Sequence, residues 1–433
     1  MIHSILTSCP DRRRGSVYIL VLGMATLVTV AGLSVLTFAR LKGREILWAN
    51  NSKEARVLAE AAVEWALTKL AADINWRTTY TNGVETAPVP LGNGTISFKL
   101  VDEADGDLAN VPTDSVRIYG IGRAGAATRL YSVKGIPNGP GLDVLKTVAH
   151  AGGNLRVLQM ITGILGPFSS NGTLTVPLGS VVNGNVEAPT LSISGTVNGT
   201  TQTVAAKTMP SSGVFGDYLA MATEIPYANI PSHTITGVVL SPAANPYGAV
   251  NPKGVYHVRV PSQMNLSIRG CRVVATLLIT LEDGATIAMS VAWRMEPPQP
   301  DCPTLLVRCL GTSATLNIDG TPSELAESAP VANFNPPGTP YPWPSGTTDS
   351  DFADSYPSLF TGLLHVIAPS TITTNLGSAF KARGTVLVEG PILAGTQTSL
   401  RADPSLYANP PAGYRKPGPM VPLAGSWRWE KAP

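Results

Sequence analysis

The sequence has little charge and no excess of either sign. Only 14% of its 433 residues are charged, and 31 basic residues nearly balance 29 acidic ones. Without surplus positive charge the chain lacks the long-range attraction that draws proteins to nucleic acid, so no nucleic-acid partner is indicated. Few residues remain for charged helix surfaces, whereas 42 glycines and 37 prolines favour turns between short elements. We therefore expect a mostly β protein.

Cysteine is scarce, at four residues. Cys9 precedes a hydrophobic segment, and Cys271, Cys302 and Cys309 share one stretch of the distal half. In an oxidising compartment Cys302 and Cys309, which are close in sequence, could form a disulfide; alternatively, all three are small buried apolar residues. No histidine stands at ligand spacing from any of them, which argues against a zinc site.

Familiar catalytic motifs are lacking. The sequence contains no G-x-S-x-G, no H-E-x-x-H and no P-loop, and its five histidines stand singly. The enzyme class that best fits the later strand pattern is a polysaccharide-active β-helix, which needs clustered carboxylates or basic residues on one face. The corresponding segments carry mostly Asn, Thr, Ser and Gly. We expect a structural protein and not an enzyme, with the β-helix enzyme as an alternative.

The strongest signal is a hydrophobic run near the N-terminus. Arg12, Arg13 and Arg14 precede the segment 16–39, which carries no charge. This run exceeds the ~20 apolar residues that cross a hydrocarbon core of about 30 Å as a helix. By the positive-inside rule the arginines, as a basic leader over 1–15, stay in the cytoplasm, and the bulk of the chain is periplasmic or extracellular. We expect single-pass anchoring in the inner membrane.

The helical pattern continues beyond this run. Residues 50–73 are rich in Ala, Leu, Glu and Lys, and Leu58, Ala62 and Trp65 recur at helical spacing. The sequence therefore predicts one helix over 16–73, whose first half spans the membrane and whose second half packs on a globular head.

These N-terminal features carry a family resemblance. The Arg-rich leader ending in Gly15, the uninterrupted apolar helix and the continuation ARVLAEAAVEWAL resemble the N-terminus of type IV pilins and pseudopilins, most closely the PilX-like and general-secretion-protein-K-like minor members. The resemblance implies that a prepilin peptidase cuts between Gly15 and Ser16. It also implies that the helix bundles with the helices of other pilin-like subunits.

The sequence departs from the family at two positions. Most pilins have Glu at mature position five, where this chain has Leu20, and Phe or Met at mature position one, where it has Ser16. In the family, that Glu pairs with the N-terminal amine of a neighbouring subunit. Its absence favours a minor or tip component of a type IV pilus or of a secretion pseudopilus. The alternative with the same topology is a single-pass membrane adhesin or envelope scaffold unrelated to pili.

Residues 74–137 are predicted to form a small β-rich head. Residues 94–101 alternate apolar and polar side chains, and 115–122 and 128–135 resemble two further strands. The string at 120–125 matches G-x-G-x-x-G, but the β-prone residues after it leave no room for the helix of a dinucleotide site. Nucleotide binding is therefore not indicated.

One loop of this head is acidic. Asp102, Asp105, Asp107 and Asp114 supply hard oxygen ligands around a glycine, as a Ca²⁺ site requires, although the spacing is not that of an EF-hand. A solvated turn without metal is the alternative. The loop thus predicts at most a structural calcium, and we expect no other cofactor.

Residues 138–433 have a different texture. Short runs of alternating apolar residues are separated by Asn-Gly and Ser-Gly corners, a pattern typical of a β-helix or β-solenoid, with an irregular β-sandwich as the alternative. Loop insertions are expected near 205–249 and 320–358, where strand signals are few or Pro, Gly and Ser dominate.

Overall fold

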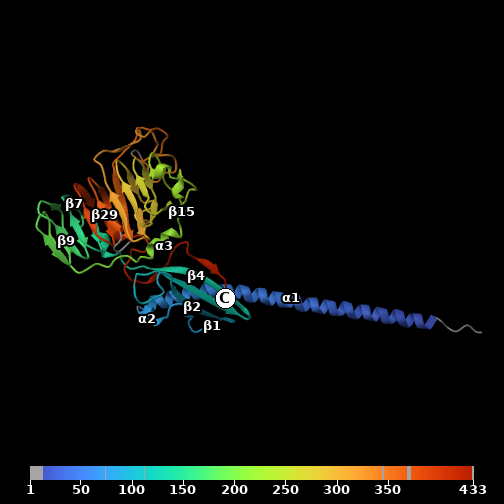
Figure 1. Cartoon of the computed structure of the whole chain (residues 1–433). Helices are drawn as coiled ribbons and strands as arrows, with labels where there is room; N and C mark the ends of the chain where they lie inside the picture. Colours follow the sequence, from blue (N-terminus) through green and yellow to red (C-terminus); the bar gives the residue numbers. More distant parts are fainter. Residues whose placement is uncertain (1–12, 74, 112, 344–345, 368–371, 432–433) are drawn as a thin grey trace, which may run out of the picture.

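The computed structural model describes residues 13–73, 75–111, 113–343, 346–367 and 372–431, with the backbone alone for 13–16. This part of the chain forms one long helix, a small antiparallel sheet and a large stack of parallel strands (Figure 1). The predicted fold class, a long N-terminal helix followed by mostly β structure with a solenoid-like domain, is confirmed. The parallel pairing of the stacked strands excludes the β-sandwich, which is built from antiparallel sheets.

Helix α1 (Arg13–Ala72) is uninterrupted over 60 residues, which corresponds to about 90 Å at 1.5 Å per residue. Every described side chain over 17–50 is exposed. Beyond this point the buried residues recur three or four positions apart and therefore lie on one face of the helix. They are Ala55, Leu58, Ala59, Ala62, Val63, Ala66 and Leu70.

The head sheet packs on this buried face of α1. It follows the short helix α2 (Trp76–Thr79) and contains the antiparallel strands β1 (Val89–Leu91), β2 (Gly94–Asp102), β3 (Val116–Ala124) and β4 (Ala127–Pro137). Phe98 of β2 and Ile118 of β3 join Val63 of α1 in one buried apolar cluster. Burial of these side chains, at about 25 cal/mol per Å², fastens the helix to the sheet.

Two glycines of β3 allow the helix to approach closely. A Cβ atom at Gly120 would lie 2.3 Å from the Ala59 carbonyl oxygen, and one at Gly122 would lie 2.2 Å from the Ala55 carbonyl oxygen. Both glycines belong to the G-x-G-x-x-G string. Their role in this fold is to admit a helix backbone against a strand.

The last strands of the chain return to the head. β33 (Met420–Pro422) and β34 (Arg428–Glu430) both pair antiparallel with β4. Trp429 lies 4.5 Å from the Tyr131 ring of β4, and the Arg56 guanidinium of α1 lies 4.4 Å from the Trp429 ring. The predicted unit 138–433 therefore needs correction at its end, because residues 420–430 complete the head sheet.

Between β4 and β33 the chain forms the solenoid, after the short helix η1 (Asp143–Lys146). Its 9-stranded sheet contains, in spatial order, β12 (Thr190–Ile193), β9 (Thr173–Val176), β6 (Leu155–Val157), β31 (Ile392–Ala394), β29 (Ile372–Leu376), β25 (Ala314–Ile318), β22 (Ala285–Met289), β19 (Asn265–Ile268) and β16 (Thr234–Ile235). Its 17-stranded sheet contains β5 (Ala149–Ala151), β7 (Met160–Ile164), β8 (Phe168–Ser170), β10 (Val181–Asn183), β11 (Val186–Ala188), β13 (Thr196–Val197), β14 (Thr201–Thr203), β15 (Thr223–Glu224), β17 (Val239–Leu240), β18 (Val255–Val260), β20 (Arg272–Val274), β21 (Thr276–Leu281), β23 (Arg294–Glu296), β24 (Leu305–Cys309), β28 (Leu359–Ile367), β30 (Lys381–Val388) and β32 (Thr398–Arg401).

Aliphatic side chains stack in register through the solenoid core. Val258, Ile279, Val307 and Val366 occupy successive strands at the same register position, and all four are fully buried. β-Branched residues suit this position because they pack well on a pleated surface and have few rotamers to lose.

The coils are not stacked in sequence order. β5, in the first coil, pairs with β8 on one side and with β30, near the end of the solenoid, on the other. From β5 the chain winds outward to β14, crosses over 204–222, and begins again at β15, which pairs with β18 at the opposite end. The later coils wind back, so that the first and last coils are neighbours.

The two expected insertions differ from each other. Residues 205–249 contain α3 (Val214–Leu219), η2 (Tyr227–Asn229) and η3 (Pro231–His233). They also contain the strands β15, β16 and β17, so part of this range belongs to the solenoid sheets and is not a loop. Residues 320–358, of which 344–345 lie outside the described residues, form an arm with one antiparallel pair, β26 (Leu325–Ala326) and β27 (Ser355–Tyr356). The solenoid ends with α4 (Pro404–Ala408).

Candidate functional site

The apolar half of α1 is the first functional surface. An 18-residue window of this helix has a mean hydropathy of 2.4, and none of the window is buried. By length and composition it can cross a membrane, and it is the one such helix in the described part of the chain. An apolar surface of this size is stable only in lipid or against other helices.

The predicted cleavage residues lie at the start of this helix. Gly15 and Ser16 fall within α1, while residues 1–12 of the leader, including Cys9, lie outside the described residues. Leu20 is 67% exposed and offers a methyl-bearing side chain where the pilin family has a carboxylate. The cut between Gly15 and Ser16 stays a prediction.

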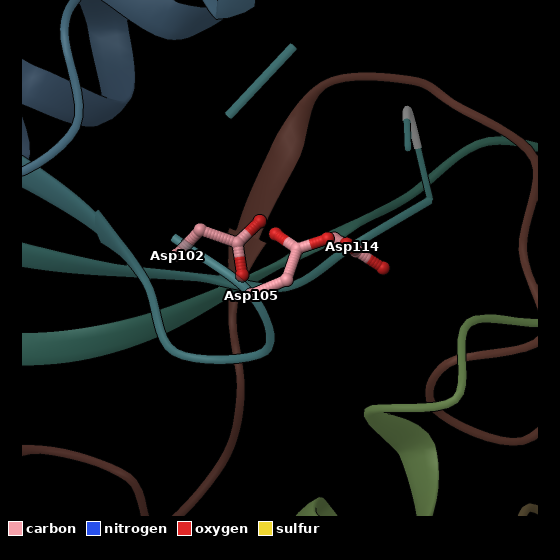
Figure 2. Close-up of side chains that lie close together, drawn as sticks. All are labelled: Asp102, Asp105 and Asp114. Atoms are coloured by element: carbon pink, nitrogen blue, oxygen red, sulfur yellow. The ribbon is translucent and has the colours of Figure 1, made fainter. Parts of the chain in front are cut away.

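The loop between β2 and β3 brings three carboxylates together. One carboxylate oxygen from each of Asp102, Asp105 and Asp114 lies within 4.8 Å of the other two (Figure 2). Asp102 and Asp114 are each only 3% exposed, whereas Asp105 is exposed. The cluster therefore has two buried members and one open to solvent.

Hydrogen bonds leave one oxygen of this cluster without a partner. Asp102 Oδ1 accepts the Ala104 N–H at 2.8 Å, but the buried Oδ2 of Asp102 has no hydrogen-bond partner. Asp105 is held by the Asp107 N–H, 3.0 Å from its Oδ1. A buried acceptor without a donor costs free energy.

Asp107 does not join the cluster. Its Oδ1 accepts the Ala109 N–H at 2.9 Å, which turns the carboxylate towards its own backbone. Four aspartates were expected to share the site, and three do so. Asp102 and Asp105 accept the N–H two residues further on in the same way, so this capping is common to the aspartates of the loop and does not by itself separate Asp107 from the cluster.

The electrostatics of the cluster reflect crowding of like charge. Burial raises the pKa of Asp114, and the negative charge of Asp102 raises it further, against the opposing effects of a hydrogen bond from Ser211 and the charge of Arg77. The exposed Asp105 has a lowered pKa because the Asp107 N–H and the Asn110 amide hydrogen-bond to it. Ser211 belongs to the crossing segment of the solenoid, and no local sequence signal connects it to this loop.

An ionic network joins the head to the solenoid beside this cluster. Arg117 of β3 pairs with Glu103 at 2.6 Å, and Lys134 of β4 pairs with Asp217 of α3. Burial raises the pKa of Asp217, and the charge of Lys134 opposes that effect. A cavity of about 760 Å³ lies at this junction, lined also by Arg308.

A second acidic cluster lies in the arm. Single carboxylate oxygens of Glu327, Asp349 and Asp354 lie within 4.8 Å of one another. Glu327 accepts the N–H groups of Phe334 and Asp354 at 2.5 and 3.2 Å, and Asn335 donates to Asp349 at 3.1 Å. These carboxylates shape the arm through their own hydrogen bonds.

The predicted disulfide is not formed. Cys271, Cys302 and Cys309 are free thiols. Cys309 ends β24, while Cys302 precedes that strand, and an extended strand advances about 3.3 Å per residue. The alternative of small apolar residues fits best at Cys271, whose burial raises the pKa of its thiol to about 12.

The outer face of the 9-stranded sheet carries polar rows. Residues that point away from the core are in register from strand to strand, about 4.8 Å apart, and none is buried. One row includes Asn265, Thr286, Thr315 and Thr373, and the next includes Thr234, Ser267, Ala288, Asn317, Asn375, Leu393, Arg156, Thr175 and Ser192. Asn375 donates to Asn317 at 2.6 Å, which continues the row as an amide ladder.

Comparison with known proteins gives no family assignment. No protein-family model matches the chain, and no curated protein matches it. Among solved structures, the chain is similar to the competence-associated pilin ComZ from Thermus thermophilus, with 12% identity and a TM-score of 0.24. The match covers 88% of this chain and 98% of the ComZ chain.

Two ice-binding proteins are similar to a smaller part of the chain. One, from an Antarctic biological consortium, is 11% identical with a TM-score of 0.21 and covers 61% of this chain and 91% of its own. The other, from the Antarctic ascomycete Antarctomyces psychrotrophicus, is 12% identical with a TM-score of 0.17 and covers 61% and 98%. These identities and TM-scores are too low to transfer a function.

Proposed function

We propose that this chain is a membrane-anchored, pilin-like structural protein, a minor or tip component of a type IV pilus or pseudopilus-like assembly. The observation that carries the proposal is the division of α1 into an exposed apolar half over 17–50 and a half whose buried stripe packs on the head sheet. One continuous helix thus serves as both anchor and core of the head.

The position of the solenoid supports a display role. The chain leaves the head after β4 and re-enters it at β33, so the solenoid is an insertion tied to the head at both ends. In Figure 1 it lies on the side of the head away from the apolar half of α1. An anchor in a membrane or filament would therefore hold the solenoid, with its polar rows, away from that surface.

The partners in this proposal are the membrane, the helices of other pilin-like subunits and a prepilin peptidase. Arg12, Arg13 and Arg14 hold the N-terminus in the cytoplasm, and the head and solenoid lie outside the inner membrane. Leu20 cannot form the ion pair that aids incorporation into a pilin shaft, which is consistent with a minor or tip position. The role proposed for the solenoid is structural and adhesive, not catalytic.

Fractionation of cells that make the full chain tests this proposal. We expect the wild type to divide between the inner membrane and the sheared filament fraction, and a Gly15→Leu variant to remain in the membrane because peptidase processing is blocked. Gly216→Leu is the matched control, since Gly216 is on α3, away from the apolar half of α1, with no atom within 4 Å of an added Cβ. If all three chains stay in the membrane, the bitopic adhesin is the better account.

A further inference from the structure

We propose that the cavity between the head and the solenoid binds a small organic anion, whose carboxylate or phosphate group is held by Arg117 of the head and Arg308 of the solenoid. The inference does not depend on the pilin-like anchor. It rests on the cavity itself, on a buried guanidinium nitrogen without a partner and on an arginine without a counter-charge.

The cavity lies where three parts of the chain meet. Its volume is about 760 Å³, within the range of about 300–1,000 Å³ that is usual for small-molecule sites. Arg117 of β3 lines it from the head, Arg308 of β24 from the solenoid, and Trp427 from the segment between β33 and β34. In Figure 1, α3 marks the solenoid side of this junction and β4 marks the head side.

The charges around the cavity are unequal. Among the described residues that line it, four carry a positive charge and two carry a negative charge: Arg117, Lys134, Arg308 and Arg428 against Glu103 and Asp217. Glu103 is shared, since it pairs with Arg117 at 2.6 Å and lies 3.6 Å from Lys134 and 3.9 Å from Arg428. Asp217 pairs with Lys134. The two carboxylates therefore leave positive charge that they do not neutralise.

Arg308 has no counter-charge of its own. It follows Leu306 by two residues on β24, so its side chain lies on the face of the sheet that α3 covers. Its guanidinium lies 4.4 Å from the Phe215 ring of α3, and its buried Nε has no hydrogen-bond partner. Burial lowers the pKa of Arg308, and the positive charge of Arg259 lowers it further. An unpaired charge in this position costs free energy, and an anion in the cavity removes that cost.

Arg117 supplies a second free donor. It is 7% exposed, and its Nε and Nη2 donate to the two carboxylate oxygens of Glu103 at 2.6 and 3.4 Å. Its Nη1 is buried and has no hydrogen-bond partner. Buried polar atoms in folded proteins nearly always have a partner, and carboxylate and phosphate oxygens are the acceptors that a guanidinium binds most strongly. A single acidic group in the cavity would satisfy both arginines.

The remaining walls favour an organic ligand over a bare inorganic ion. Trp427 is held in place by stacking on Tyr131, with 5.4 Å between the ring centroids. Ile367 and Met221 add apolar surface to the same cavity. Small-molecule sites usually combine apolar walls with a few polar groups that fix the orientation of the ligand. The ligand class is therefore an acidic group on an organic body, and the surplus positive charge disfavours a cation.

Calorimetric titration of the full chain in detergent tests the site with three compounds that share one sugar ring. They are glucuronate, which carries a carboxylate, glucose 6-phosphate, and neutral glucose. We expect the anions to bind at one site per chain and glucose not to bind, because only the anions neutralise the arginines. Binding of one anion alone supports the site and identifies the acidic group that it prefers. Binding of neither anion, or equal binding of glucose, would overturn the proposal.

Arg308→Gln and Arg259→Gln form a matched pair of variants. Both arginines are in register with Thr280, one on each neighbouring strand, but Arg259 pairs with Glu282 at 2.7 Å and is not among the described residues that line the cavity. We expect Arg308→Gln to reduce anion affinity about tenfold or more, because it removes a charge-assisted hydrogen bond. Arg259→Gln should stay within about twofold of the wild type, since exposed charges are screened by salt. Equal losses in the two variants would contradict a site at Arg308.

Thermal unfolding without and with the anion separates binding from folding. Because Arg308 is unpaired, we expect Arg308→Gln to keep or raise the melting temperature without ligand. The anion should raise the melting temperature of the wild type and of Arg259→Gln, and leave that of Arg308→Gln unchanged. A melting temperature of Arg308→Gln well below that of the wild type without ligand would show that Arg308 stabilises the fold itself, which would overturn its role in binding an anion.

Discussion

The imidazole of His150 is buried in the solenoid on β5. Its Nδ1 lies 3.0 Å from Ser169 Oγ, and its Nε2 has no hydrogen-bond partner. Burial lowers the pKa of His150 from 6.5 to about 3, and the positive charge of Lys207 contributes in the same direction. Lys207 itself pairs with Glu187 at 2.8 Å. The folded protein therefore holds this histidine neutral at every pH above about 3.

This histidine predicts a loss of stability in acid. The unfolded chain binds a proton at His150 below about pH 6.5, whereas the folded chain does so only near pH 3, so the free energy of unfolding falls as the pH decreases through that window. The fall amounts to at most about 1.4 kcal/mol per pH unit. Urea unfolding at pH 7 and pH 5 should show the wild type losing roughly 2 kcal/mol more than His150→Gln. The carboxylates titrate equally in both proteins, so their contributions cancel when the two falls in the free energy of unfolding are compared. Equal falls in the wild type and in His150→Gln would refute the buried neutral histidine.

The acidic loop shows what residue-level reasoning could reach. The sequence offers Asp102, Asp105, Asp107 and Asp114 as calcium ligands, with a solvated turn as the alternative, and the structure brings Asp102, Asp105 and Asp114 together. It could not show that Asp107 lies outside the cluster, because Asp102, Asp105 and Asp107 all cap the N–H two residues further on and differ only in where the folded loop places them. It could not supply Ser211 either, since that contact depends on how the solenoid meets the head.

Helix α1 packs closely against β3 in the head. An added Cβ at Gly122 would lie 2.2 Å from the Ala55 carbonyl oxygen and 2.4 Å from the Ala59 nitrogen, distances that real Cβ atoms do not show. Both atoms belong to the helix backbone, which cannot move aside without opening the interface. Gly120 and Gly122 of the G-x-G-x-x-G string are thus explained by the packing of α1 and not by a phosphate site.

We therefore expect Gly122→Ala to destabilise the head by about 1–3 kcal/mol, the usual range for overpacking a closed interface. The matched control is Gly216→Ala on α3, where an added Cβ meets no atom within 4 Å and the helix propensity improves. Thermal unfolding followed by circular dichroism measures both. Equal melting temperatures for Gly122→Ala and the wild type would mean that α1 does not pack on β3 as described.

Some elements were predictable and others were not. The long helix follows from an uncharged run joined to a helix-forming segment, and the parallel strands follow from short apolar runs with Asn-Gly corners. β33 and β34 escaped prediction because each has three residues and pairs with β4, far away in the chain. Strands this short are defined by their partner and not by their own sequence.

At the scale of the whole molecule, the chain combines three parts with separate physical tasks. The apolar half of α1 requires a membrane or other helices, the head joins that helix to both chain ends of the solenoid, and the solenoid presents ordered polar rows. The main-chain N–H of Asn138 donates to the carbonyl oxygen of Pro419 at 2.9 Å, so the entry and exit of the solenoid lie side by side. The solenoid is therefore tied to the head at both of its ends.

The order of the coils could not be read from the sequence. The coils have similar strand patterns, so the sequence does not predict their order in space. In the structure the chain starts in the middle of the stack, winds outward to β14 and begins again at β15. Long-range parallel pairing of β30 with β5 sets this order. Such pairings depend on the complete set of buried side chains in the core.

The central claim is that this protein is anchored by a pilin-like N-terminal helix, and the N-terminal sequence of the mature chain tests it most directly. Protein recovered from membranes of the native cells and sequenced from its N-terminus is predicted to begin at Ser16, with Gly15 and the basic leader removed. A chain that still begins at Met1 would contradict the pilin-like account and leave a single-pass anchor in its place.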